Sequence, residues 1–292
     1  MGATLSAIAQ RRPSDDFTGE YHVYEPHKVG LPPLGPYFRA LWARRQFLYE
    51  LSRTNLRAQH FNTTFGQLWL ILNPVMLGVV YFTLVYIIRS GGRGTVFLAH
   101  LMLSLFAFRL VSTSVSQGAR SVVGGGKLIL NVAFPRLLLP LESVLESFMR
   151  FLPTVVVYAV LHAVIGLPVG PQLLWVVPII ALFVVFGAGA AMFTATSQVY
   201  FRDLTNFLPY FTRIWLYTSP ILFYAEDVPE RLRPILYLNP LYPMLASLND
   251  VVIEGRTPPF SLIGASLAWA VGTILAGTVF FISREREFAI RL

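Results

Sequence analysis

Three ionisable residues lie in long apolar stretches of this sequence, where a charge finds few partners. Arg109 stands in the run SLFAFRLVS, and Glu146 and Arg150 lie four residues apart in a second apolar run. An arginine in the middle of a membrane helix costs about 2.5 to 3.5 kcal/mol on insertion scales, so a partner or a water-filled cavity is expected. Arg109 and Glu146 lie at similar depths in two predicted helices and could pair with each other. Glu146 could equally pair with Arg150, one helical turn away.

A run of three glycines that ends at Gly126 and precedes Lys127 is the second pattern that suggests chemistry. Glycine-rich turns before a lysine can bind phosphate, and a Walker A loop requires G-x-x-x-x-G-K followed by Ser or Thr. Here Leu128 follows the lysine, and Ser121 occupies the position of the first glycine. We therefore expect no ATP hydrolysis by this chain and no cofactor bound to it.

Other signs of catalysis are absent from the sequence. The chain has no cysteine, and its five histidines are scattered, so neither thiolate chemistry nor a metal-binding pattern is indicated. A membrane-embedded glycosyltransferase would need a cluster of catalytic carboxylates, and no Asp-x-Asp motif occurs. We expect that the chain is not an enzyme and holds no metal.

Composition decides the class of protein. Hydrophobic residues make up 55% of the 292 residues and charged residues 13%, whereas a soluble domain carries about 25% charged residues. The sequence therefore predicts an all-α integral membrane protein. Its net charge of +8 requires no nucleic acid as a partner, because basic residues at the cytoplasmic ends of membrane helices face anionic lipid.

Apolar runs of sufficient length predict six transmembrane helices. They cover residues 68–88, 96–118, 137–165, 172–199, 206–224 and 260–282. An even number of spans places both termini on one side of the membrane. Most arginines near the span ends, including Arg120, Arg136 and Arg284, then lie on that same side, so both termini are predicted to be cytoplasmic.

The residues before the first span form two further segments. Residues 1–38 are polar and rich in proline, which predicts a cytoplasmic N-terminal arm. Residues 39–60 carry an apolar stripe opposite a polar one, which predicts an amphipathic helix at the membrane interface. The transmembrane domain then comprises residues 61–292.

Residues 227–252, between the fifth and sixth predicted spans, are too often interrupted by proline to cross the membrane again. Pro229 suits the first turn of a helix, and Asn239, Pro240 and Pro243 mark a break before a second one. Broken helices occur at membrane depth where protein or a water-filled cavity satisfies the backbone. We therefore predict two re-entrant external helices that gate a translocation path, and the alternative is a loop lying flat on the outer surface.

Several short motifs resemble one known family. They are Leu68 and Trp69 in FGQLWLILNP, Phe134-Pro135-Arg136 with Pro140, Arg202-Asp203, Ser219-Pro220-Ile221, and Asn239-Pro240 with Pro243. Their order resembles that in the membrane subunits of ABC-2 type polysaccharide exporters, the Wzm-like or TagG-like permeases of O-antigen, teichoic acid and galactan export. The resemblance covers residues 51–292 and is greatest to the permeases of actinobacterial galactan exporters. One departure is the segment around Phe106, which lacks a tryptophan that the family often has, so no role of that tryptophan is carried over.

The resemblance implies a homodimeric permease in the bacterial plasma (inner) membrane, paired with two copies of a separate ATPase chain that binds ATP and Mg²⁺. The substrate would be a lipid-linked polysaccharide, a galactan or O-antigen-like glycan of the cell envelope. A cytoplasmic coupling helix between the second and third spans would dock on the ATPase. Its candidate residues are Val122, Lys127, Leu128, Ile129 and Leu130.

A sugar chain that crosses the bilayer needs a polar or aromatic-lined passage, because an unpaired hydroxyl in hydrocarbon costs several kcal/mol. The candidate lining residues are Tyr81, Phe82, Tyr86, Phe106, Phe108, Trp215 and Tyr217. Tryptophan and tyrosine near helix ends also serve as interface anchors. Two other functions remain open: export of another lipid or a drug by an ABC-2 exporter, and a membrane transporter or channel outside the ABC class.

Overall fold

The computed structural model describes residues 33–58, 64–88, 94–131 and 134–291, and within these ranges every regular element is a helix. The predicted all-α class is thus confirmed for the described part of the chain. Residues 1–32 of the predicted N-terminal arm lie outside it.

In the described part of the chain, five helices are long and apolar enough to cross a membrane. They are built on α3 (Trp69–Ile88), α4 (Gly94–Gly124), α6 (Leu138–Ile165), α7 (Val176–Tyr200) and α11 (Phe260–Arg284). The shorter helices are α1 (Leu34–Ala43), α2 (Arg45–Ala58), α5 (Gly126–Asn131), α8 (Leu204–Thr218), α9 (Arg233–Leu236), α10 (Tyr242–Val252) and α12 (Phe288–Arg291). The five long helices coincide with the first, second, third, fourth and sixth predicted spans.

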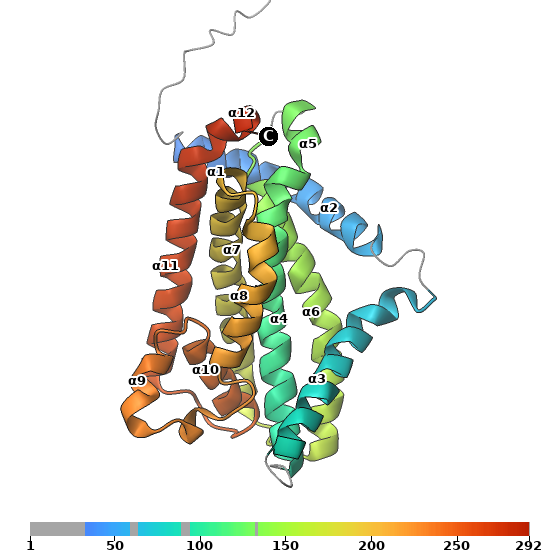
Figure 1. The fold of residues 1–292 in the computed structure, drawn as a ribbon, viewed down its shortest axis with the longest axis vertical. Coiled ribbons are helices and arrows are strands. Elements are labelled where there is room, and N and C mark those ends of the chain that lie inside the picture. The colour runs from blue at the N-terminus through green and yellow to red at the C-terminus, as the bar shows by residue number, and fades with distance from the viewer. Residues whose placement is uncertain (1–32, 59–63, 89–93, 132–133, 292) are drawn as a thin grey trace, which may run out of the picture. The chain divides into compact units, whose positions relative to one another are not determined.

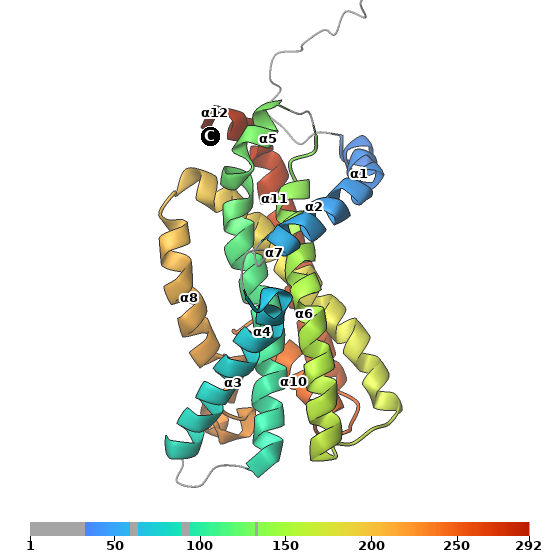
Figure 2. The ribbon, with the colours of Figure 1, turned by 90° about the vertical axis from the view of Figure 1, so that its right-hand side faces the viewer.

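The fifth predicted span, 206–224, does not form one long helix. Its helix α8 has 15 residues, which rise roughly 22 Å against about 30 Å of hydrocarbon. The helix ends because Ser219 is extended, with ψ at 147°, and a residue before proline disfavours the helical region. Even so, α8 begins at the end of the bundle that holds α5 and finishes toward the end that holds α10 (Figures 1 and 2).

The two ends of the bundle differ in what they carry. Helices α1, α5 and α12 lie at one end, called the α5 end, together with the C-terminus (Figure 1). Helices α9 and α10 lie at the opposite end, called the α10 end. Helix α3 is inclined to the other long helices and packs on α4 and α6 (Figure 2).

Helix α4 forms the centre of the core, where it packs between α6 and α7. The approach to α7 is close because Gly118 faces Ala191, and a Cβ at Gly118 would lie 2.6 Å from the Cβ of Ala191. On its other side, α7 crosses α11, where Gly189 and Gly277 bring the two backbones into contact. The small residues of α7 therefore mediate helix packing within this chain.

The predicted interface helix, 39–60, is two helices instead of one. Helix α1 begins at Leu34, inside the region predicted to be an extended arm, and the chain bends at Arg44 before α2. Helix α2 packs on α6 through the buried Ser52, whose hydroxyl donates to the carbonyls of Leu48 (2.9 Å) and Glu142 (3.3 Å). The hydrogen bond to Leu48 lies within α2 and is common for serine in a helix. The hydrogen bond to Glu142 joins α2 to α6.

Candidate transport and coupling sites

The predicted coupling helix over residues 122–130 is interrupted at Gly125. Helix α4 continues to Gly124, so the fully buried Val122 belongs to α4 and not to the loop helix. A Cβ at Gly125 would lie 2.8 Å from the Leu139 side chain and 2.9 Å from the Ser121 carbonyl, which explains why glycine stands at the break.

Helix α5 packs its apolar residues on the chain itself. Ile129 is only 7% exposed and belongs to a cluster with Phe281 and Phe288, and Leu128 is half-buried against the same cluster. The apolar character of this segment thus reflects internal packing. Because Ile129 is buried, an acidic substitution there would disturb folding and could not report on docking. The predicted docking on an ATPase must therefore be examined at more exposed positions. Lys127 and Leu130 lie in α5 as well.

A buried carboxylate joins three segments at the α5 end. Glu285, directly after α11, accepts hydrogen bonds from the Tyr37 hydroxyl (2.6 Å) and the Arg136 backbone amide (2.7 Å). The Arg136 guanidinium also donates to the Glu285 carbonyl. Burial and the neighbouring Glu285 raise the pKa of Tyr37, so its hydroxyl keeps the proton that it donates. Helix α1, the segment after α5 and the end of α11 are therefore fixed to one another.

Sequence reasoning missed Glu285. The available signal was a glutamate between two arginines, immediately after the sixth predicted span, together with Arg136 in the family motif. Nothing in the linear pattern places Tyr37 beside them, because the hydrogen bond joins residues 248 positions apart.

A polar cluster lies between α4 and α6 in the middle of the chain's long helices. Arg150 and Glu146 form an ion pair one turn apart on α6. With its amide nitrogen toward Glu146 and its oxygen toward Arg150, Gln117 of α4 bonds to both at 3.1 Å. Glu142, one turn nearer the α5 end, accepts from the Asn55 amide of α2 at 3.1 Å. Of the two pairs that the sequence left open, the structure forms the local one.

Arg109 points elsewhere. Among the residues that the structure describes, its side chain makes no hydrogen bond or ion pair, and its ionisable neighbours are Arg150 and the Tyr81 hydroxyl. It lines a pocket of about 80 Å³ between α3, α4 and α6. Arg150 lines the same pocket.

The candidate lining residues fall into two groups. Phe106 and Phe108 are buried in the core of α4, and the Trp215 indole packs on Phe108 and donates to Asn239 at 3.0 Å. In contrast, Tyr86 and Tyr217 are exposed. Tyr81 and Phe82 are partly exposed on α3, and Tyr81 interacts with Tyr217 of α8 through its hydroxyl. Within this set, the tyrosines of α3 and α8 are thus exposed or partly exposed on the surface of the chain.

The segment predicted to be external, residues 227–252, contains short helices, as the prolines indicate. Pro229 precedes a short 3₁₀ turn that leads into α9, and Pro243 stands in the first turn of α10. Asn239 links this segment to the end of α8: its side chain accepts from Trp215 and Leu241 and donates to the Ser219 hydroxyl at 2.8 Å. Pro240 follows it in the turn that begins α10.

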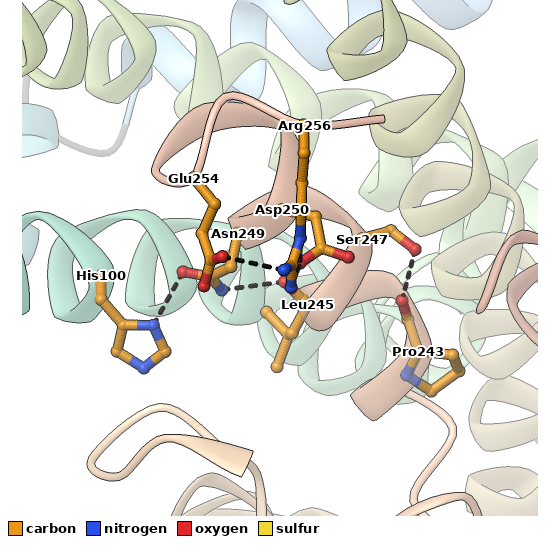
Figure 3. A network of polar contacts seen from close by, with 8 residues as sticks. All are labelled: His100, Pro243, Leu245, Ser247, Asn249, Asp250, Glu254 and Arg256. Carbon is orange, nitrogen blue, oxygen red and sulfur yellow. Dashed lines mark hydrogen bonds and ion pairs between the residues drawn. The ribbon is translucent and has the colours of Figure 1, made fainter. Parts of the chain in front are cut away.

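Helix α10 is held in the bundle by a polar network at the α10 end (Figure 3). His100 Nδ1 of α4 lies 2.7 Å from Asn249 Oδ1, and the Asn249 amide donates to the Ser104 hydroxyl at 3.2 Å. On the next residue, Asp250 pairs with Arg256 at 2.6 Å. Sequence reasoning missed this network because its hydrogen bonds between α4 and α10 join residues 145 and 149 positions apart in the chain.

Cysteine labelling can test the burial of α10, and the cysteine-free chain provides a clean background. Leu245 is fully buried, whereas Leu238, a few residues earlier, is 73% exposed. We expect Leu245→Cys to resist a bulky, membrane-impermeant maleimide and Leu238→Cys to react with it when added to intact cells. Equal labelling of both variants would contradict the packing of α10 and the predicted gate.

No group of three or more metal-binding side chains occurs among the described residues, and the charged cluster of α4 and α6 contains no nucleophile placed beside a general base. The arrangement consists of long apolar helices, a polar pocket at their mid-length and a closely packed α5 end.

Comparison with known proteins agrees with this arrangement. A family model described as ABC-2 type transporter matches residues 45–253, which extend from α2 through α10. Two proteins of Klebsiella pneumoniae, each named O-antigen export system permease protein RfbA, are 28% and 27% identical over 211 residues, 71% of this chain and 80% of each relative. The protein of the same name from Myxococcus xanthus is 28% identical over 257 residues, 86% of this chain and 97% of the relative.

The family match covers well over half of the chain and includes four of the five long apolar helices. The chain therefore belongs to the ABC-2 type transporter family, as a multi-pass integral membrane protein.

Proposed function

We propose that the chain is the membrane-spanning permease of an ATP-driven exporter that moves a lipid-linked polysaccharide out of the cytoplasm. The observation that carries this proposal is the similarity to permeases named for O-antigen export, which extends over 97% of the Myxococcus xanthus relative. A galactan or an O-antigen-like glycan of the cell envelope is the expected cargo, and galactan is favoured by the sequence resemblance to actinobacterial exporters.

The permease acts as a homodimer with two copies of a separate ATPase chain that binds ATP and Mg²⁺. Six crossings, with α8 as the fifth, place both termini on the cytoplasmic side of the bacterial plasma membrane. The location of α1, α5 and α12 at one end of the bundle supports this topology (Figure 1). Arg120, Arg136 and Arg284 near that end agree with the positive-inside rule.

Export begins when ATP binding closes the ATPase dimer and displaces α5. The Glu285 contacts carry this displacement toward α1 and α11, since they join these helices to the segment directly after α5. The helices then separate to open a path between the two permeases, where the tyrosines of α3 and α8 contact the sugar. The re-entrant α9 and α10 close the path on the outer side.

Copurification tests the proposal most directly. An affinity-tagged form of this chain, extracted in mild detergent from its bacterial host, should retain an ATPase chain in equal amount. Depleting the chain should cause a lipid-linked polysaccharide to accumulate inside the cell, because the only exit is closed. Val123→Asp, at an exposed position beside α5, should reduce the copurified ATPase and leave the permease folded.

Each alternative gives a different result in these experiments. A channel or secondary transporter would purify without an ATPase. An exporter of another lipid or a drug would retain the ATPase, but its depletion would leave polysaccharide export unchanged. Either result would overturn the proposed function.

A further inference from the structure

The pocket between α3, α4 and α6 has an unusual set of polar groups for its position. It lies at mid-length of α4 and α6, two of the long apolar helices, and has a volume of about 80 Å³. A water molecule requires about 10 to 15 Å³ on this scale, so the pocket has room for several waters or one small anionic group. Its polar lining residues are Asn73, Arg109, Thr113, Ser147, Arg150 and Thr154.

Donors without acceptors dominate this lining. Arg109 makes no hydrogen bond among the described residues, and the Nε of Arg150 is buried without a partner. By contrast, the Ser147 and Thr154 hydroxyls already donate to carbonyls of their own helix, both at 2.7 Å. A ligand that completes the pocket must therefore supply acceptors.

The charges in the pocket point to an anion. Two guanidinium groups, Arg109 and Arg150, line the pocket, and no carboxylate of the described residues does. Glu146 pairs with Arg150 and bonds to Gln117 outside this lining. Glu142 does not line the pocket and is bonded to Asn55. Water could hydrate the arginines but would leave one positive charge unpaired in an apolar layer, where it is costly. Sugar hydroxyls would satisfy donors but would not neutralise it.

We propose that this pocket binds a phosphoryl group through Arg109 and Arg150. Phosphoryl oxygens accept several charge-assisted hydrogen bonds at once, and the planar fork of arginine matches their geometry. Asn73, on the side of α3, supplies a further donor. The origin of the phosphoryl group rests on the proposed function: it belongs to the lipid carrier that bears the polysaccharide.

Binding to the purified full-length chain tests the site without ATP or the ATPase. The chain is kept in a non-ionic detergent, and bound ligand is counted by native mass spectrometry. The probes are a polyprenyl diphosphate, the uncharged polyprenol of the same length, phosphatidylglycerol and inorganic diphosphate. We expect the polyprenyl diphosphate to bind and the polyprenol to bind at least about tenfold more weakly, since the charge-assisted bonds are lost.

Three variants locate the site. Arg109→Gln should weaken binding of the polyprenyl diphosphate by about tenfold or more, and Arg109→Lys by less, because the charge remains while the fork is lost. Arg231→Gln, which removes an exposed arginine from the external segment, should leave binding unchanged. If Arg109→Gln does not fold, Asn73→Asp repels an anion from the same pocket and should give the same loss.

The other probes identify the source of the phosphoryl group. Equal binding of phosphatidylglycerol would assign the site to ordinary lipid headgroups, and equal binding of inorganic diphosphate would assign it to a free anion. Equal binding of the polyprenol would overturn the proposal, as would unchanged binding by Arg109→Gln and Asn73→Asp. No ATPase takes part in this binding experiment. If the chain failed to copurify with an ATPase, the proposed function would be overturned but the binding result would still hold.

Discussion

Replacing Gly277 by valine is expected to remove most of the folded protein, because no space exists for a side chain where α11 crosses α7. A Cβ at this position would overlap the carbonyl oxygen of Gly189, and both contacting groups are backbone. Separating the helices would also disturb the contact of α7 with α4 at Gly118. Inserting extra atoms into a well-packed core lowers the free energy of unfolding by about 1 to 3 kcal/mol and occasionally more. A collision between backbones should cost an amount at the upper end of this range.

The measurement is the yield of monodisperse protein in size-exclusion chromatography, followed by the thermal midpoint of whatever remains. Gly264→Val is the matched control, since it lies in the same helix and a Cβ added there would have no neighbour within 4 Å. It should behave as the unchanged protein or slightly better, because glycine is a poor helix former. Normal yield from Gly277→Val would show that α7 and α11 are not packed as described.

Replacing Glu285 by alanine is expected to lower stability and to interrupt communication between α5 and α11. The Tyr37 hydroxyl and the Arg136 amide would both lose their acceptor. Each buried donor left without an acceptor costs about 1 to 3 kcal/mol. Tyr37→Phe removes only one of these hydrogen bonds and should have a smaller effect. Glu285→Gln retains one acceptor oxygen, so its stability should lie between that of the alanine variant and that of the unchanged protein.

Glu287→Ala is the control for this experiment. Glu287 lies two residues further on and bonds to Tyr200, Arg284 and Arg291, but it is partly exposed to solvent, and ion pairs near the surface contribute little. Thermal midpoint and polysaccharide export are measured for each variant, together with the ATPase activity of the assembled transporter. If Glu285→Ala and Glu287→Ala cannot be distinguished in stability, the buried junction at the α5 end is wrong. If only export is unaffected, the junction is structural and does not transmit motion.

The sequence by itself determined the class of protein and most of the long helices. A run of some 20 apolar residues can satisfy its backbone in a membrane only as a helix, so the predicted span 137–165 and helix α6 (Leu138–Ile165) nearly coincide. The predicted helix ends differ from the observed ones where glycine or proline stands near them. Helix α4 extends beyond the predicted residue 118 to Gly124, and α8 stops before Pro220.

Tertiary structure decided which side chains meet. Arg109 and Glu146 lie at compatible depths, yet the rotation of α4 and α6 directs Arg109 into a pocket and leaves Glu146 to Arg150. The rotation of α4 also buries Phe106 and Phe108. An apolar helix has a weak polar stripe, so its sequence reveals its length and depth but not the direction in which each residue points. Contacts such as Tyr37 with Glu285 arise only when helices distant in the chain are packed together, because local patterns carry no information about residues 248 positions apart.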